Sequence, residues 1–294
     1  MTITAQTVKE LREKTGCGFM DCKAALAENN GDLEASVDFL RKKGIASAAK
    51  KAHRETGEGL IVAHLAEDRR NGSLVEVNCE TDFVARTGDF QSLVADLARQ
   101  AAGTADTITT AEELLAQPFI NDAGQTVQDA LNAAVGKIGE NMRLRRFVRF
   151  AGEGEGVIEA YIHPGSKIGV LIDVSCDAAL KEKDEFRTMV RDLAMQVAAA
   201  APSFLREEDV PADVIAREKE VLLGQARESG KPENVLEKIV EGRIKKYFED
   251  ACLLNQKFVK DTDRTVQDVV KDAAAALGGE VAVRRFQRYQ LGRD

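Results

Sequence analysis

The sequence contains one long segment twice, and this duplication constrains the fold more than any other feature. The two copies keep the same order along the chain, and their matching segments are 59–80 with 156–177, 90–102 with 186–198, 126–131 with 265–270, and 138–150 with 277–289. A duplication of this length indicates one supersecondary unit that is used twice. Residues that agree between the copies therefore report the shared fold, whereas residues that differ are candidates for a function carried by one copy.

Each copy is predicted to form strand, strand, helix, helix, strand. β-Branched residues alternate or run together where strands are expected, and amphipathic stretches follow. The expected elements are strands 60–65, 73–78 and 143–150 with helices 89–102 and 127–136 in the first copy, and strands 157–162, 168–175 and 281–290 with helices 184–198 and 266–276 in the second. This order predicts an α+β fold in which each copy builds a three-stranded antiparallel sheet with helices on one face.

Residues 1–52 differ in composition from the repeats and predict a very small three-helix bundle. Helices are expected over three stretches separated by glycine or asparagine turns, namely 4–14, 20–28 and 33–42. Gly44 is expected to end the third helix. A bundle of this size is marginal on its own. The charged stretch 46–58 is then either a linker or an exposed helix that leads to the repeats.

The second copy is longer than the first. Phe90 and Thr126 are 36 residues apart in the first copy. Their counterparts Phe186 and Thr265 are 79 residues apart, which leaves 43 additional residues near 203–255. The second copy therefore carries an insertion.

The insertion is predicted to form a helical hairpin. Apolar residues repeat there at spacings of four and seven, which favours helices 212–229 and 233–252 with a Gly-Lys-Pro turn at 230–232. Such an arm buries little surface by itself, so it is either a decoration or a lever for interaction with a partner. The expected domains are the bundle (1–52), the first repeat (53–151) and the second repeat with its insertion (152–294).

The net charge argues against non-specific electrostatic binding to nucleic acid or to an anionic membrane. The chain has 41 basic and 49 acidic residues, a net charge of −8, and its basic pairs are interleaved with apolar or acidic residues. A nucleic-acid surface needs a concentrated positive field. No apolar run in the sequence approaches about 18 residues, the length that a membrane-spanning helix needs. The protein is therefore expected to bind neither nucleic acid nor a membrane.

Cysteine usage and the N-terminus predict a cytoplasmic protein. Five cysteines, an odd number in a long chain, favour a reducing compartment over a disulfide framework. The first turns carry charged residues where a secretory signal would have an apolar core.

The sequence lacks the motifs of the common enzyme classes. GEGEG at 152–156 has no Lys-Ser/Thr after it and no apolar strand before it, so it is interpreted as a linker and not as a phosphate-binding loop. Cys17 and Cys22 have no second pair of ligands, and the three histidines are far apart, so neither a metal site nor a cofactor is expected. Cys79 and Cys176 are equivalent residues at strand ends, which favours packing over a nucleophile that would need a partner histidine.

The most informative difference between the copies follows the first two strands. The first copy continues with Thr81, Asp82, Phe83 and Val84, called here the 81–84 loop, where the second has Ala-Ala-Leu-Lys at 178–181. A polar turn with Phe83 at its tip is one interpretation. The other is that Phe83 folds back into the core, as Leu180 can in the second copy, and spacing alone leaves both open. The turn that begins at His163 poses a similar choice.

A set of motifs carries a family resemblance that extends over nearly the whole chain. The motifs occur in the order of the family and are TGCGFMDCKAAL (15–26), NGDLEAS (30–36), VNCETDFVAR (77–86), KIGENM (137–142), SGKP (229–232) and EGRIKK (241–246). Together they resemble bacterial elongation factor Ts. Their combination is far more specific than any one of them.

The resemblance implies a nucleotide-exchange factor for the translational GTPase elongation factor Tu, with no enzymatic activity of its own. Residues 1–52 resemble the ubiquitin-associated-like (UBA-like) bundle of the family, and the insertion resembles its coiled-coil arm. Some members continue past the last strand into a C-terminal helical module. This sequence stops at Asp294, so the resemblance does not carry over the contacts made by that module. A homodimer or a 2:2 complex with the GTPase stays open.

The same resemblance implies a set of partner contacts. Asp82 and Phe83, within the 81–84 loop, match the residues that enter the GTPase. There the Phe wedges between helices, and the loop dislocates the Mg²⁺ ion bound with the nucleotide. Ile138 and Gly139 match a second contact, and His163 matches a third in the second repeat.

Two other classes of function remain from the residues alone. One is a passive adaptor whose bundle and arm bind partners without promoting exchange. The other is an enzyme that uses a thiol, with Cys79 as the candidate nucleophile. Measuring nucleotide release from the GTPase distinguishes a passive adaptor from an exchange factor. Insensitivity to thiol blocking would count against the thiol enzyme.

Overall fold

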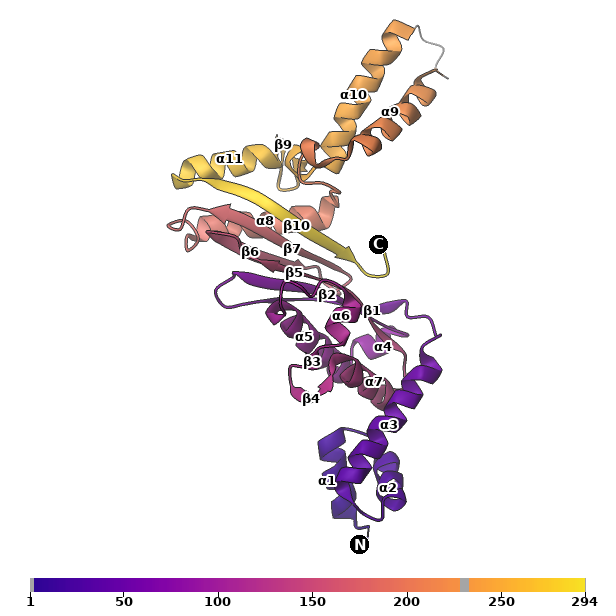
Figure 1. Ribbon diagram of the computed structural model, residues 1–294. Helices are drawn as coiled ribbons and strands as arrows, with labels where there is room; N and C mark the ends of the chain where they lie inside the picture. The colour runs from indigo at the N-terminus through magenta and orange to yellow at the C-terminus, as the bar shows by residue number, and fades with distance from the viewer. Residues whose placement is uncertain (1–2, 228–232, 294) are drawn as a thin grey trace.

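The computed structural model describes residues 3–227 and 233–293. The molecule is elongated, with three helices at the N-terminal end, two sheets in the middle and a helical hairpin at the opposite end (Figure 1). The predicted α+β class is confirmed. Among the described residues no helix is both long and apolar enough to cross a membrane.

The N-terminal helices pack around a small core of their own. They are α1 (Ala5–Thr15), α2 (Phe19–Glu28) and α3 (Leu33–Lys51). Their buried apolar residues are Val8, Leu11, Cys22, Ala25, Leu26 and Leu40. Thr4 caps α1, and Gly16 ends it with a φ of 66°, a conformation that glycine adopts at little cost. The three predicted helices are therefore present.

The third helix is longer than predicted, because Gly44 does not end it. Helix α3 continues to Lys51, and Gly44 is buried where α3 crosses α7 (Val127–Ile138). A Cβ atom on Gly136 of α7 would lie 3.0 Å from the Cα of Gly44. The glycine thus permits two helices to approach closely. Of the two alternatives for 46–58, the helix is correct as far as Lys51.

Each repeat forms the predicted three-stranded antiparallel sheet. The first sheet has the order β1-β2-β5, and the second has the order β10-β7-β6. The first consists of β1 (Glu58–Leu65), β2 (Asn71–Cys79) and β5 (Met142–Ala151); the second consists of β6 (Gly156–Ile162), β7 (Ile168–Cys176) and β10 (Val281–Gln290). Helices α5 (Gly88–Gly103) and α7 cover the first sheet, and α8 (Asp184–Ala200) and α11 (Val266–Leu277) cover the second.

Several short elements were not predicted, because they are too brief to show a periodic pattern. They are the helices α4 (Asp82–Ala85), α6 (Ala111–Leu115), η1 (Glu207–Asp209) and η2 (Leu253–Asn255), and the ribbons β3 (Pro118–Phe119) with β4 (Asp122–Thr126) and β8 (Lys257–Phe258) with β9 (Asp261–Thr265). The two ribbons are 139 residues apart, so they belong to the repeated unit.

The two sheets pack face to face, so that helices form the outer layers on both sides (Figure 1). The interface core is built from equivalent residues of both copies, and its buried members are Ile61, Leu74, Phe150, Ile158, Leu171 and Tyr289. Gly72 and its counterpart Gly169 make room for it, since a Cβ on either would lie within 3 Å of side chains from the opposite sheet. This packing was not predicted.

Paired contacts show that the interface has an internal pseudo-two-fold axis. The Ile61 N–H donates to the Ser166 carbonyl at 2.8 Å, and the Ile158 N–H donates to the Arg69 carbonyl at 2.8 Å. Each member of one bond lies 97 residues from its counterpart in the other. The contact between the copies is therefore reciprocal, as in a symmetric dimer joined into one chain.

The insertion is an arm of two antiparallel helices that stands off the second repeat (Figure 1). Helix α9 spans Ala212–Arg227 and α10 spans Glu233–Ala251. At the base, the backbone N–H groups of Ser203 and Phe204 both donate to the Ala251 carbonyl. The chain thus enters and leaves the arm at one place. The predicted turn at 230–232 lies outside the described residues.

Candidate functional site

The 81–84 loop lies at the end of strand β2. Thr81 is the N-cap of helix α4, and its Oγ1 accepts a hydrogen bond from the Val84 N–H at 3.3 Å. The same hydroxyl lies 2.6 Å from Oε1 of Glu140. A carboxylate only accepts, so the hydroxyl donates its proton to Glu140 and keeps a lone pair for Val84. The loop is therefore a hydrogen-bonded turn between the end of strand β2 and the start of helix α4.

Phe83 lies at the tip of this turn and is 80% exposed. The core interpretation of Phe83 is therefore wrong. Asp82 is also accessible and makes an ion pair with Arg86 at 2.9 Å, one helical turn away. Val84 points the other way and packs partly buried on the core of the first repeat. The loop thus presents Asp82 and Phe83 to solvent and is anchored by Val84.

Helix α7 ends beside the loop and supplies the second predicted contact. Gly139 is its C-cap, with a φ of 92°, and is exposed. Ile138 is partly buried against the core of the first repeat. The next residue, Glu140, accepts hydrogen bonds from the backbone N–H groups of Glu80 and Thr81 at 3.1 and 3.0 Å. The structure therefore brings Ile138 and Gly139 together with the 81–84 loop.

The end of helix α7 is also tied to the end of the N-terminal region. The Asn141 N–H donates to Glu80 Oε1 at 2.6 Å, and the Asn141 side chain donates to the Arg54 carbonyl at 2.8 Å. The Arg54 guanidinium lies 3.4 Å from Glu80. The hydrogen bond from Asn141, with a smaller effect of Arg54, lowers the pKa of Glu80 below its ordinary value.

His163 lies in the turn between β6 and β7 and is exposed. Its Nδ1 is 3.0 Å from the Tyr161 hydroxyl. Lys167 of the same turn makes an ion pair with Glu58 at 2.9 Å, and Glu58 is opposite Cys79 in the register of β1 and β2. The turn therefore reaches the end of the first sheet from which the 81–84 loop emerges, although no direct bond joins His163 to that loop among the contacts described.

Cys79 lies under the loop and is unsuited to act as a nucleophile. It is fully buried, and its Sγ is 3.2 Å from the Thr81 carbonyl. Burial and the nearby Glu140 carboxylate raise the pKa of the thiol to about 12. A thiol held protonated in this way is inert at neutral pH. The structure thus argues against the thiol-enzyme alternative.

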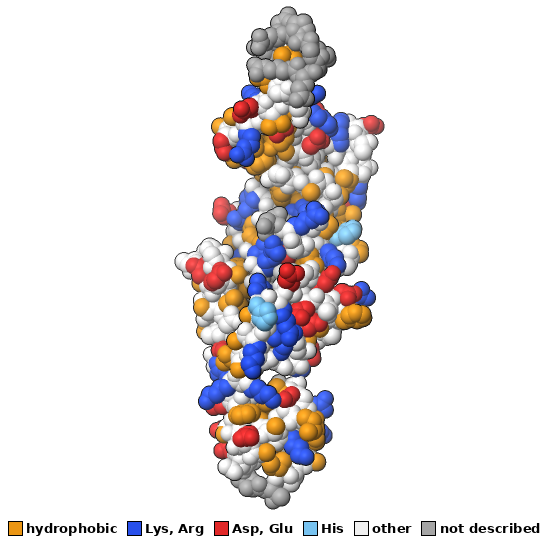
Figure 2. Space-filling view, turned by 90° about the vertical axis from the view of Figure 1, so that its right-hand side faces the viewer, with side chains coloured by type: hydrophobic (Ala, Val, Ile, Leu, Met, Phe, Trp, Pro, Cys, Tyr) orange, Lys and Arg blue, Asp and Glu red, His pale blue; other side chains and the backbone are white. Residues whose placement is uncertain are grey.

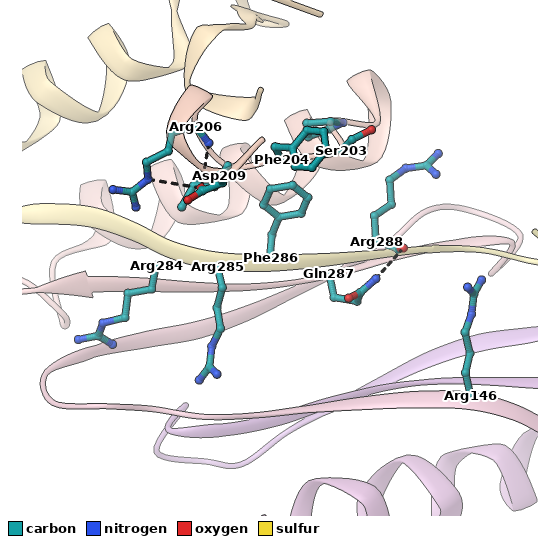
Figure 3. Close-up of a pocket in the computed structure, with 12 residues that line it drawn as sticks. Arg146, Ser203, Phe204, Arg206, Asp209, Arg284, Arg285, Phe286, Gln287 and Arg288 are labelled. Atoms are coloured by element: carbon teal, nitrogen blue, oxygen red, sulfur yellow. Dashed lines mark hydrogen bonds and ion pairs between the residues drawn. The ribbon is translucent and has the colours of Figure 1, made fainter. Parts of the chain in front are cut away.

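An arginine-rich cleft of about 580 Å³ lies between strand β10 and the base of the arm. Figure 3 shows that its side chains diverge: Phe286 points toward Phe204, while Arg284 and Arg285 point to the other side of the strand. Arg284 and Arg285 bind the buried Asp173 at 3.1 and 3.2 Å. The first repeat has arginines at the equivalent positions. These arginines therefore belong to the shared fold.

The charges on the surface are mixed. On the face shown in Figure 2, Lys and Arg side chains are interspersed with Asp and Glu. No group of three or more His, Cys, Asp or Glu that could hold a metal ion is present within residues 3–227 and 233–293.

The sequence interpretation missed the residues that hold the loop, namely Glu80, Glu140 and Asn141. A signal was present, because Glu140 faces Gly279 when the copies are aligned, just as Thr81 faces Ala178. Sequence alone did not reveal that these two differences meet in space.

Comparison with known proteins gives one consistent result. The family described as elongation factor TS matches residues 80–293. Proteins named elongation factor Ts from Trichlorobacter lovleyi, Clostridium botulinum (strain Alaska E43) and Clostridium perfringens (strain SM101) are 48%, 47% and 44% identical to this chain. Each of these alignments covers 99% of this chain and 93% of the relative. The chain therefore belongs to the elongation factor Ts family.

Proposed function

We propose that this protein is the nucleotide-exchange factor for elongation factor Tu, and that it acts by binding and not by covalent chemistry. The observation that carries the proposal is the 81–84 loop, which presents an exposed Phe83 in one repeat only. A large exposed apolar side chain beside a polar one is a common anchor for a protein partner. Membership of the elongation factor Ts family supports the choice of partner.

Exchange follows from thermodynamic reciprocity. A factor that binds the nucleotide-free GTPase more tightly than the GDP form must weaken GDP binding by the same ratio. A 10⁴-fold weakening needs roughly 5.5 kcal/mol of differential contact. Burying one phenylalanine contributes about 1.5–3 kcal/mol. Phe83 therefore cannot act alone, and other contacts must contribute.

The proposed division of work follows three places in the fold: the end of strand β2, the end of helix α7 and the turn between β6 and β7. Asp82 and Phe83 enter the GTPase, where Phe83 wedges between helices and the loop displaces the Mg²⁺ ion that the GTPase holds with its nucleotide. Thr81 and Val84 belong to the same contact. Ile138 and Gly139 form a second contact, and His163 forms a third.

The remaining parts of the chain are assigned by the same proposal. Residues 1–52 form a UBA-like domain that adds contacts to the GTPase, 53–151 and 152–294 form the two repeats of the core, and the arm is a coiled coil available to a partner. The protein has no enzymatic chemistry of its own and works in the cytoplasm during translation elongation.

The direct test is release of labelled GDP from a purified Tu-type GTPase with and without this protein. Acceleration at substoichiometric concentration supports exchange. Tight binding without acceleration would establish the adaptor alternative instead. Light scattering on the same complexes distinguishes 1:1 from 2:2 stoichiometry.

The magnesium component has its own test. Chelation of Mg²⁺ should accelerate GDP release by itself, and the further acceleration by this protein should then be smaller. An equal acceleration with and without chelator would remove Mg²⁺ displacement from the mechanism and leave the Phe83 wedge.

A further inference from the structure

We propose that Glu140 is the positioning residue that holds the 81–84 loop outward and so keeps Phe83 exposed for its partner. This inference rests on the proposed exchange function and identifies what prepares the loop for it. Glu140 is 59 residues from Thr81 in the sequence, yet its carboxylate lies directly against the turn.

The carboxylate satisfies three donors of the turn at once. Oε2 accepts from the backbone N–H groups of Glu80 and Thr81 at 3.1 and 3.0 Å, and Oε1 accepts from the Thr81 hydroxyl at 2.6 Å. Hydrogen bonds to an ionised carboxylate are shorter and stronger than those between neutral groups. The strand end and the start of helix α4 are thereby fixed to the end of helix α7.

The second repeat has no carboxylate at the matching position. Gly279 takes the place of Glu140, and Leu180, which follows Cys176 at the same distance as Phe83 follows Cys79, is buried with an exposure of 2%. A Cβ on Gly279 would lie 2.9 Å from a methyl carbon of Leu180 and 2.5 Å from Oδ2 of Asp177. The inward Leu180 therefore occupies space that a side chain at position 279 would need.

One hydrogen bond of this corner is the same in both repeats. Glu80 accepts from the Asn141 N–H at 2.6 Å, and its counterpart Asp177 accepts from the Glu280 N–H at 2.9 Å. This shared bond is present at the end of the second strand both in the first repeat, where Phe83 points outward, and in the second repeat, where Leu180 points inward. The shared bond therefore does not decide the direction of the loop, whereas Glu140 is found only where the loop points outward.

A preformed loop lowers the cost of binding, because a partner does not have to order it. Removing the Glu140 carboxylate should therefore weaken the function of Phe83 without removing Phe83. An amide at this position keeps the size of the side chain, but its oxygen is a weaker acceptor and its NH₂ group faces a donor. Glu140→Gln is for this reason the informative change, and Glu140→Asp tests the reach of the carboxylate.

Glu113 provides a matched control elsewhere in the first repeat. Its Oε2 accepts from the N–H groups of Thr109 and Thr110 at 2.8 and 3.0 Å and from the Thr109 hydroxyl at 3.3 Å. Glu113→Gln therefore removes the same kind of contact from a turn outside the proposed site. It should leave GDP release unchanged.

The experiment measures two quantities on the full-length protein. Hydrogen exchange of the free protein should show that Glu140→Gln speeds amide exchange at residues 80–84, while protection in the sheets stays as in the wild type. Acceleration of GDP release should fall roughly tenfold, as expected for loss of a charge-assisted hydrogen bond that orders the loop. Adding Glu140→Gln to Phe83→Ala should cost little more, because both changes act through one side chain.

The outcomes separate this inference from the function on which it rests. Wild-type protein that fails to accelerate GDP release would overturn the exchange function, while hydrogen exchange at 80–84 would still test the role of Glu140. Unchanged amide exchange at 80–84 in Glu140→Gln would overturn the positioning role, as would a full multiplicative loss in the double variant. If Glu140→Gln does not fold, the same measurements on Glu140→Asp decide: lost protection at 80–84 together with slower GDP release supports the inference, and normal release with an unprotected loop refutes it.

Discussion

Phe83 is the fourth residue after Cys79 and Leu180 is the fourth residue after Cys176, yet Phe83 is 80% exposed and Leu180 is 2% exposed. The strands that lead to them have the same register and the same length. The difference is therefore confined to the turn that follows. In the second repeat this turn packs on the core, whereas in the first repeat it presents Phe83 at the surface.

This contrast predicts opposite effects on stability. Leu180→Ala should lower the free energy of unfolding by about 2–5 kcal/mol, because it leaves a cavity in the core of the second repeat. Phe83→Ala should change it by less than about 0.5 kcal/mol, because no core contact is lost. Urea denaturation followed by circular dichroism measures both. Equal losses for the two variants would mean that Phe83 packs in solution.

The lowered pKa of Glu80 predicts an acid-dependent contribution to stability. A carboxyl group whose pKa is lower in the folded protein stabilises the fold above its unfolded pKa and loses that effect as the pH falls through its folded pKa. Glu80→Gln should therefore destabilise the protein at pH 7, and the difference from the wild type should shrink below about pH 4.5, the ordinary value for glutamate. Denaturation curves for both proteins at pH 7 and near pH 3.5 measure this. A difference independent of pH would contradict it.

The close crossing of α3 and α7 predicts that Gly136 cannot be replaced without loss. Gly136→Ala places a methyl group 3.0 Å from the Cα of Gly44, and such overpacking costs about 1–3 kcal/mol, of which the helix preference of alanine recovers up to about 1 kcal/mol. Gly224→Ala is the control, since α9 leaves open space there and alanine favours a helix by about 1 kcal/mol. Thermal unfolding should shift down for the first variant and not for the second. Stabilisation by Gly136→Ala would show that the crossing is looser than described.

The base of the arm predicts that the arm can be removed. Ser203, Phe204 and Ala251 already lie side by side through backbone hydrogen bonds, so residues 212–249 can be replaced by a short Gly-Ser linker. The deletion variant should still unfold in one cooperative transition, because the first repeat closes its sheet without such an insertion. A broad, non-cooperative transition would show that the arm is part of the core of the second repeat.

The sequence predicted the strands and the long helices of both repeats within about two residues, because their period and their duplication are local signals. It did not predict that the sheets face each other. Strand β2 is buried at nearly every position, which indicates that both faces of its sheet are covered. The local sequence pattern does not show which element covers the face opposite the helices. The predicted end of the third helix at Gly44 was wrong, because in the sequence a glycine that permits close helix contact looks the same as a glycine that ends a helix. The exposure of Phe83 was left open, because spacing alone fits both an outward and an inward side chain, and the residue that we propose to decide it, Glu140, is distant in sequence.

The measurement that tests the central claim most directly is the rate of GDP release from a Tu-type GTPase with wild-type protein, Phe83→Ala and Ile120→Ala. Ile120 is the matched control, because it is a large apolar residue of the same repeat with an exposure of 46%. Loss of one buried phenylalanine contact is worth about 1.5–3 kcal/mol, so Phe83→Ala should slow the catalysed release by roughly 10- to 100-fold at limiting concentration. Ile120→Ala should retain the wild-type rate. Equal rates for all three proteins would contradict the claim that the outward turn of the first repeat drives nucleotide exchange.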